Sequence, residues 1–235
     1  MTAAPTMPDL ALDAQRGSHS LQRLVGRHSW ALLINGSSET MELPPADALI
    51  SDPPYGINYK PEGGGKVPKN FTNADCVIGD DKPFDPAMWL NYSIVVLWGG
   101  SNFAARLPAT RGWLVWDKKC GVNETNQFSD CEIAWTNLNA PIRLYRHRWT
   151  GYMKDSEKQE ARLHPTQKPA ALMAWCMEKA KVPEGATVLD PYMGSGTTGI
   201  ACLRTKRNFI GVEKDKRHFD NACDRMRREI EETLL

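Results

Sequence analysis

Short apolar runs alternate with amphipathic segments over most of the chain. Seven such runs predict strands, at residues 30–35, 47–51, 93–99, 112–117, 131–136, 186–190 and 208–213. Several are apolar at nearly every position, as is typical of parallel strands buried on both faces. The intervening segments predict helices at 85–92, 101–108, 168–181, 197–206 and 216–232. The pattern therefore predicts an α/β fold, doubly wound around a mostly parallel sheet.

Two stretches break this alternation. Residues 57–80 contain three adjacent glycines and little apolar periodicity, which predicts a long lid loop. Residues 137–163 interleave arginines with aromatic residues, a composition that suits phosphates and exposed bases but also a solvated charged loop. We expect residues 1–29 to form an N-terminal extension and residues 30–235 to form one domain.

The composition narrows the function classes only a little. A net charge of +1, with 41% hydrophobic and 24% charged residues, is ordinary for a globular protein and leaves room for a local basic face. The six cysteines include no CxxC pair, and the five histidines show no zinc-ligand spacing. We therefore expect a cytoplasmic protein without a metal site, a signal peptide or a membrane span.

The stretch VLDPYMGSGTTG contains a glycine motif between a predicted strand and a predicted helix. Gly194, Gly196 and Gly199 spell GxGxxG, and Glu213 ends the next predicted strand, where an acid can bind a ribose. Asp190 would repel a pyrophosphate but could accept a hydrogen bond from an α-ammonium group, which favours S-adenosylmethionine over a nicotinamide dinucleotide. The alternative is that the glycines only form a tight turn.

A second motif, SDPPYG, follows the apolar run ADALI. Two consecutive prolines cannot donate to a sheet ladder, so the strand must end near Asp52. The Asp52 carboxylate and the Pro53 carbonyl are then two hydrogen-bond acceptors held at the carboxyl edge of the sheet, where open α/β sheets bind ligands. A purely structural cap of the strand is the alternative.

Three motifs in this order resemble the β-class of DNA amino-methyltransferases. They are DPPY at 52–55, HPTQKP at 164–169 and DPYMGSGTT at 190–198, and the resemblance extends from about residue 30 to the C-terminus. It implies a Rossmann-like methyltransferase fold with a small target-recognition insertion at 137–163. It also implies S-adenosylmethionine as cofactor, bound by Asp190, Tyr192, Gly194, Ser195, Gly196, Thr197, Thr198, Glu213, Thr166, Lys168 and Ser37. Ser37 stands where the family commonly carries an acid that helps to recognise the adenine of the cofactor.

The same resemblance gives the DPPY motif a chemical role. An exocyclic amine is a poor nucleophile, and acceptors aimed at its two N–H groups would draw the nitrogen toward tetrahedral geometry. Asp52 and Pro53 are those acceptors, Pro54 stiffens the segment, and Tyr55 offers a ring on which the base can stack. The target base must leave the duplex to reach them.

The resemblance also favours adenine N6 over cytosine N4 as the target, because the motif begins with Asp52 whereas enzymes that act on cytosine more often carry serine there; the two amines present the same donors. Carbon-5 methylation of cytosine is excluded because its cysteine nucleophile follows a proline, and the chain contains no Pro-Cys dipeptide.

Double-stranded DNA is the expected partner, and a homodimer could share the task of recognition. Candidate DNA contacts are Lys60, Lys66, Lys69, Arg143, Arg146, Arg148 and Trp149. Two other function classes stay open: an inactive DNA-binding protein with a methyltransferase fold, and a nicotinamide-dependent oxidoreductase. The latter leaves the DPPY motif unexplained.

Overall fold

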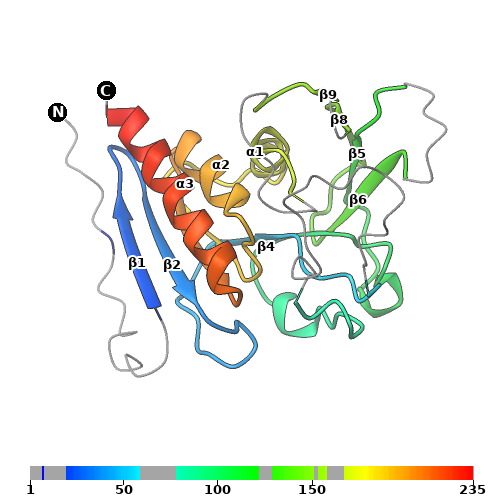
Figure 1. The fold of residues 1–235 in the computed structure, drawn as a ribbon. Helices are drawn as coiled ribbons and strands as arrows, with labels where there is room; N and C mark the ends of the chain where they lie inside the picture. The colour runs from blue at the N-terminus through cyan, green and yellow to red at the C-terminus, as the bar shows by residue number, and fades with distance from the viewer. Residues whose placement is uncertain are drawn as a thin grey trace.

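The computed structural model describes residues 7, 20–58, 78–121, 129–150, 153–157 and 167–234. Their strands form a nine-stranded sheet with the order β1-β2-β11-β10-β3-β4-β6-β5-β7, and β8 and β9 form a separate pair. Figure 1 shows β1 at one end of this arrangement and β5 and β6 toward the other.

Five parallel strands make up the centre of the sheet. They are β2 (Trp30–Asn35), β11 (Asn208–Glu213), β10 (Thr187–Asp190), β3 (Ala48–Ser51) and β4 (Ile94–Trp98). Nearly all their side chains are buried, as the continuous apolar runs predict. The prediction of a mostly parallel α/β sheet is therefore confirmed.

The flanking strands complete the sheet. β6 (Cys131–Thr136) runs antiparallel to β4 and to β5 (Trp113–Asp117), and β7 (Arg143–Arg146) pairs parallel with β5 at one edge. At the other edge β1 (Ser20–Val25) runs antiparallel to β2, so the expected N-terminal extension contributes a strand to the sheet. The short pair consists of β8 (Trp149–Thr150) and β9 (Met153–Lys154).

Three helices cover one face of the sheet, namely α1 (Ala170–Lys179), α2 (Thr197–Arg204) and α3 (Lys216–Leu234) (Figure 1). Alternate strand residues point to this face, so Val96 and Trp98 of β4 pack in the helix-side core whereas Val95 and Leu97 pack in the opposite core. Among the described residues, no helix is long and apolar enough to cross a membrane.

The opposite face is covered differently from the prediction. The helices expected at 85–92 and 101–108 are wrong, because only the 3-10 turns η3 (Ala87–Trp89) and η4 (Ala104–Arg106) form there. Pro108 disfavours a helical conformation for the preceding residue, and Leu107 is indeed extended. Phe84, Trp89 and Phe103 from these segments fill the core on this face.

The strand order creates a switch point between β10 and β3. From β10 the chain continues to β11 on one side, and from β3 it continues to β4 on the other. The carboxyl ends of both strands lie at the same edge, and ligands of open α/β sheets bind in the crevice at such a point. The DPPY motif follows β3 and the glycine motif follows β10, so the topology brings both motifs to this crevice.

Candidate active site

The two sequence motifs open onto one cavity. Ser51 at the end of β3 donates a 2.6 Å hydrogen bond to Asp190 at the end of β10, although 139 residues separate them. The cavity beyond this bond has a volume of about 330 Å³. The residues predicted for the site that line it are Ser37, Asp52, Pro53, Pro54, Tyr55, Tyr192, Gly194 and Glu213.

On the β3 side, Asp52 is held by two neighbours. Tyr55 donates its hydroxyl hydrogen to Asp52 Oδ1 at 2.6 Å, and the Lys168 ammonium lies 2.5 Å from Asp52 Oδ2. The Tyr55 ring packs directly against Gly99, where a Cβ atom would fall 2.0 Å from a ring carbon. Only glycine fits there, so the backbone after β4 fixes the orientation of the ring.

Two further charged residues, Glu132 and Lys118, line the same side of the cavity. Glu132 lies 3.2 Å from the Lys168 ammonium and accepts a 2.9 Å hydrogen bond from Lys118. Burial would raise the pKa of Glu132, but Lys168 and Lys118 together lower it to about 2. Burial raises the pKa of Asp52, and Lys168 offsets part of that rise. The Asp52 carboxylate is therefore surrounded by a connected group of charged side chains.

The position of Lys168 differs from the expectation. We expected its ammonium at the cofactor, yet it contacts Asp52, Glu132 and the Tyr55 hydroxyl. The segment before α1 passes beside the DPPY loop, and two carboxylates draw the ammonium inward. Thr166 of the same motif lies outside the described residues.

On the β11 side, Glu213 forms the wall of the cavity. Its carboxylate accepts hydrogen bonds from the backbone N–H groups of Gly194 at 3.0 Å and Asp215 at 2.7 Å. Burial raises the pKa of Glu213 to about 7. Gly194 has a φ of +52°, and nothing lies within 4 Å of the place where its Cβ would stand. The glycine motif thus leaves open space beside a carboxylate.

Asp190 lies behind this wall rather than in it. It is buried, and it accepts 2.6 Å hydrogen bonds from Ser51 and Thr198 as well as the backbone N–H of Tyr192. Burial raises its pKa to about 6. Asp190 therefore ties the glycine loop to β3.

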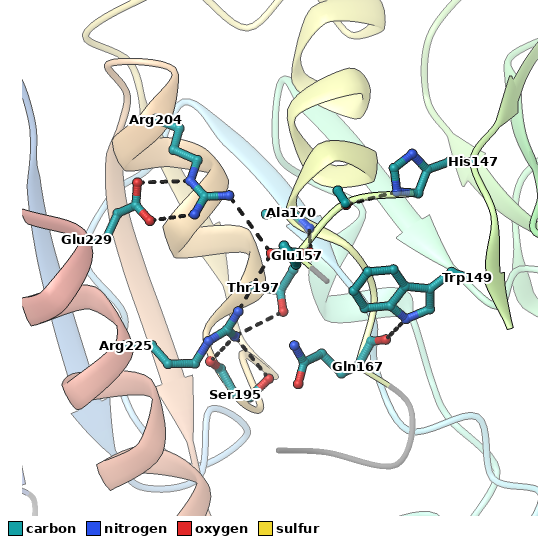
Figure 2. Close-up of polar contacts among 11 residues, drawn as sticks. His147, Trp149, Glu157, Gln167, Ala170, Ser195, Thr197, Arg204, Arg225 and Glu229 are labelled. Atoms are coloured by element: carbon teal, nitrogen blue, oxygen red, sulfur yellow. Dashed lines mark hydrogen bonds and ion pairs between the residues drawn. The ribbon is translucent and has the colours of Figure 1, made fainter. Parts of the chain in front are cut away.

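The remaining glycine-loop residues are also held from behind. Figure 2 shows Arg225 of α3 reaching the loop, where it donates to the Ser195 carbonyl at 2.7 Å and approaches the Ser195 and Thr197 hydroxyls at 3.4 Å. Gly196 has a φ of +79°, and a Cβ there would lie 2.7 Å from Met226 of the same helix. These residues shape the loop from its buried side.

A sequence profile described as DNA methylase, for N6 and N4 methyltransferases, matches residues 101–224, which is more than half of the chain. The chain belongs to this DNA methylase family. Among the described residues of the chain, no group of three or more histidine, cysteine, aspartate or glutamate side chains could hold a metal ion.

Several bacterial proteins are similar to this chain. The type II methyltransferase M2.DpnII of Streptococcus pneumoniae is 40% identical over 83 residues, which are 35% of this chain and 31% of that protein. The type II methyltransferase M.HinfI of Haemophilus influenzae is 29% identical over 142 residues, or 56% of this chain and 38% of that protein. The chain spans about a third of the length of the curated relatives it matches.

Solved structures of similar proteins include M1.HpyAVI in complex with SAM and the cytosine-N4-specific PvuII DNA methyltransferase. The first is 25% identical and covers 77% of this chain and 88% of its own, with a TM-score of 0.47. The second is 13% identical and covers 87% of this chain and 92% of its own, with a TM-score of 0.48. Both TM-scores lie below 0.5.

The predicted DNA-contacting residues differ in their exposure and in their partners. Arg143 and Arg146 are exposed on the edge strand β7, and Arg146 lies 3.5 Å from Asp117. Arg148 is half-buried, with its backbone N–H on Asp155. The prediction for Trp149 needs correction: only 8% of it is exposed, and its indole N–H donates to the Gln167 carbonyl at 2.9 Å (Figure 2).

The predicted lid at 57–80 is described only at its two ends. Asp80 holds these ends together, because its carboxylate accepts the backbone N–H of Gly56 at 2.8 Å and its carbonyl accepts that of Asn58 at 2.7 Å. Ile57 and Ile78 line the cavity at these ends. Lys60, Lys66 and Lys69 lie outside the described residues.

Sequence reasoning missed several residues of the cavity wall. They are Ser38, Glu39, Asp80, Lys118, Glu132, Lys214, Asp215 and His218. Glu39 accepts a 3.3 Å hydrogen bond from Tyr192, so a carboxylate does stand close to the position of Ser37. Glu132 lies on β6 and Lys118 directly follows β5, both of them predicted strands, but only the pairing of β6 with β4 and β5 brings their side chains to the Asp52 side of the cavity.

Proposed function

We propose that this DNA methylase transfers a methyl group from S-adenosylmethionine to the exocyclic N6 of an adenine flipped out of double-stranded DNA at a specific sequence. The observation that carries the proposal is the single cavity lined by both Asp52–Tyr55 and the Gly194–Glu213 wall. A methyl donor and an amine acceptor must meet within one such space, because transfer requires close, aligned approach.

The cofactor side of the cavity suits S-adenosylmethionine. The Glu213 carboxylate at the end of β11 can accept hydrogen bonds from ribose hydroxyls, and the side-chain-free backbone of Gly194 leaves room for the cofactor beside it. The similar protein M1.HpyAVI was crystallised in complex with SAM. When bound, S-adenosylmethionine would supply an electrophilic methyl group, and its sulfur would keep the electron pair of the broken S–C bond as a neutral thioether.

The residues of the DPPY motif supply the acceptor side. Asp52 and the Pro53 carbonyl accept the two N–H groups of the target amine, and Tyr55 stacks on the base. The Asp52 carboxylate favours the positive charge that develops on the nitrogen as the N–C bond forms. The methylated nitrogen then carries one proton too many, and Asp52 is the base positioned to take it.

Adenine is the proposed target because the motif begins with aspartate, and cytosine N4 is the alternative. Radiolabelled methyl transfer to DNA followed by nucleoside analysis tests this assignment. We expect N6-methyladenine, and N4-methylcytosine as the only product would overturn the choice of base. Methylation-sensitive sequencing of the same DNA would give the recognition site.

The substitution Asp52→Ala tests the proposed mechanism. We expect turnover to fall at least about 100-fold, because an acceptor aimed at developing charge is removed. Binding of S-adenosylmethionine, measured by calorimetry, should stay close to that of the wild type because Asp52 faces the base. Loss of cofactor binding instead would contradict the assigned roles.

Two properties of the whole protein extend the proposal. A homodimer would enlarge the small recognition surface around β7, and sedimentation with and without DNA measures its presence. The bacterial origin of the similar type II methyltransferases supports a cytoplasmic setting in a bacterium or phage. If the wild type binds DNA but neither binds S-adenosylmethionine nor methylates, the protein is an inactive DNA-binding member of its family.

A further inference from the structure

The Lys168 ammonium occupies a buried position between three acceptors. Its side chain is only 4% exposed, and its Nζ lies 2.5 Å from Asp52 Oδ2 and 3.2 Å from Glu132 Oε2. It also donates to the Tyr55 hydroxyl at 2.9 Å. Since Tyr55 itself donates to Asp52, the three side chains of Asp52, Tyr55 and Lys168 form a closed triangle.

The charges around this triangle balance. Two carboxylates and two ammonium groups lie in contact, namely Asp52, Glu132, Lys118 and Lys168. Without Lys168, the two carboxylates, whose side chains are only 18% and 25% exposed, would have Lys118 alone as a countercharge, and Lys118 contacts Glu132 rather than Asp52. A partly buried carboxylate without a countercharge takes up a proton instead.

We propose that Lys168 is a positioning residue for Asp52, which it holds ionised and oriented toward the target amine, and that it does not bind the cofactor. The inference rests on the proposed function, because it is the ionised form of Asp52 that stabilises the charge developing on the target nitrogen and can take up its proton. Lys168 itself touches neither reacting atom in this arrangement.

The neighbouring charges predict the direction in which each substitution shifts the pKa of Asp52. Glu132 on β6 and burial raise the pKa of Asp52, whereas Lys168 and the Tyr55 hydroxyl lower it. Asp190 on β10 and Asp80 at the lid are the other carboxylates near this group. Replacing Lys168 by a neutral residue must therefore raise the pKa of Asp52, and replacing Glu132 by a neutral residue must lower it.

The test is the pH dependence of kcat/KM for DNA at saturating S-adenosylmethionine, in the wild type, K168Q, E132Q and K168R. We expect the acid limb to move up by about one pH unit or more in K168Q and to move down in E132Q. K168R keeps the charge and should return the acid limb toward that of the wild type. The dissociation constant for S-adenosylmethionine should change by less than about threefold in K168Q, since a tenfold change would correspond to about 1.4 kcal/mol of lost contact.

Opposite shifts from two neighbouring substitutions cannot come from general damage to the site. An unchanged acid limb in K168Q, together with a loss of cofactor affinity of about tenfold or more, would overturn the proposal and make Lys168 a cofactor ligand. Shifts in the same direction in K168Q and E132Q would also overturn it. If K168Q does not fold, a second neutral substitution of the same side chain, K168M, takes its place, with the same expected rise of the acid limb and the same result overturning the proposal.

A second measurement separates this inference from the proposed function. Carbon-13 NMR of the Asp52 carboxyl group reads its titration directly, without turnover. An inactive wild type would overturn the proposed function, whereas an Asp52 titration that is identical in the wild type and K168Q would overturn the role of Lys168.

Discussion

At the scale of single residues, the site depends on carboxylates whose surroundings differ. Glu132 is held ionised by two lysines, and burial raises the pKa of Glu213 to about 7. Asp190 has a pKa raised to about 6 and is engaged by two hydroxyl groups behind the wall. Each carboxylate has a different task because each has different neighbours.

The proposed contact of Glu213 with the ribose predicts that cofactor binding depends on pH. Ribose hydroxyls donate to the ionised carboxylate, so binding favours the charged form and releases a proton when the pH lies below about 7. We expect the dissociation constant for S-adenosylmethionine to rise as the pH falls from 8 to 6. Calorimetry in buffers of different ionisation enthalpy measures both the affinity and the released proton.

The substitution Glu213→Gln is the control for that prediction. It should weaken binding at pH 8 by about 1.5 to 3 kcal/mol, the worth of hydrogen bonds to a charged group, and abolish the pH dependence around 7. A proton release near pH 7 that persists in E213Q would assign the titration to another group.

At the scale of elements, α3 holds the glycine loop in place through one buried arginine. Arg225 donates to Ser195, and it lies 3.8 Å from Glu157, which also faces Arg204 at 3.9 Å (Figure 2). Glu157 in turn accepts the backbone N–H of Ala170, at the start of α1. A helix at the end of the chain thereby connects the glycine loop to the segment that leads into α1.

The substitution Arg225→Met should be strongly destabilising. It leaves the Ser195 carbonyl and the buried Glu157 carboxylate without this cation, and breaking a buried pair costs about 3 to 5 kcal/mol. Arg227→Met on the same helix is the matched control, because Arg227 is 43% exposed and its pair with Asp224 contributes about 1 kcal/mol or less. Urea denaturation measures both, and equal losses would show that Arg225 has no special role.

The individual strands show which sequence patterns predicted secondary structure correctly and which did not. Every strand of the parallel centre lies within a predicted run, because burial on both faces leaves a continuous apolar signal. The edge strands β1 and β7 were missed, since SLQRLV and RLYR carry as many polar as apolar positions. Trp149 was misassigned because an aromatic residue among arginines has the same local composition whether it faces solvent or the core.

At the scale of the whole molecule, the net charge is only +1, so the proposed DNA binding must depend on where the charges lie. Arg143 and Arg146 are exposed at the β7 edge, whereas Arg27 is exposed beyond β1 at the opposite edge of the sheet. Exposed arginines therefore lie at both edges of the sheet.

We predict that DNA binds at the β7 edge and not at the β1 edge. Arg143→Ala should weaken DNA binding and reduce the slope of log K against log salt by about one, as expected for one lost phosphate contact. Arg27→Ala, the matched control, should change neither. Fluorescence anisotropy at several salt concentrations measures both variants, and an equal effect of R27A would refute a binding surface at β7.

The sequence by itself determined the parallel core, the ends of its strands and the chemistry of the two motifs, because apolar runs, paired prolines and spaced glycines act through local geometry. Only the tertiary structure decided that both motifs share one cavity, that Lys168 lies on Asp52, and that Asp190 lies behind the wall. Those facts depend on which strands become neighbours and on the balance of charges between distant segments. No short stretch of sequence encodes either, since contacts across the sheet are set by the whole chain at once.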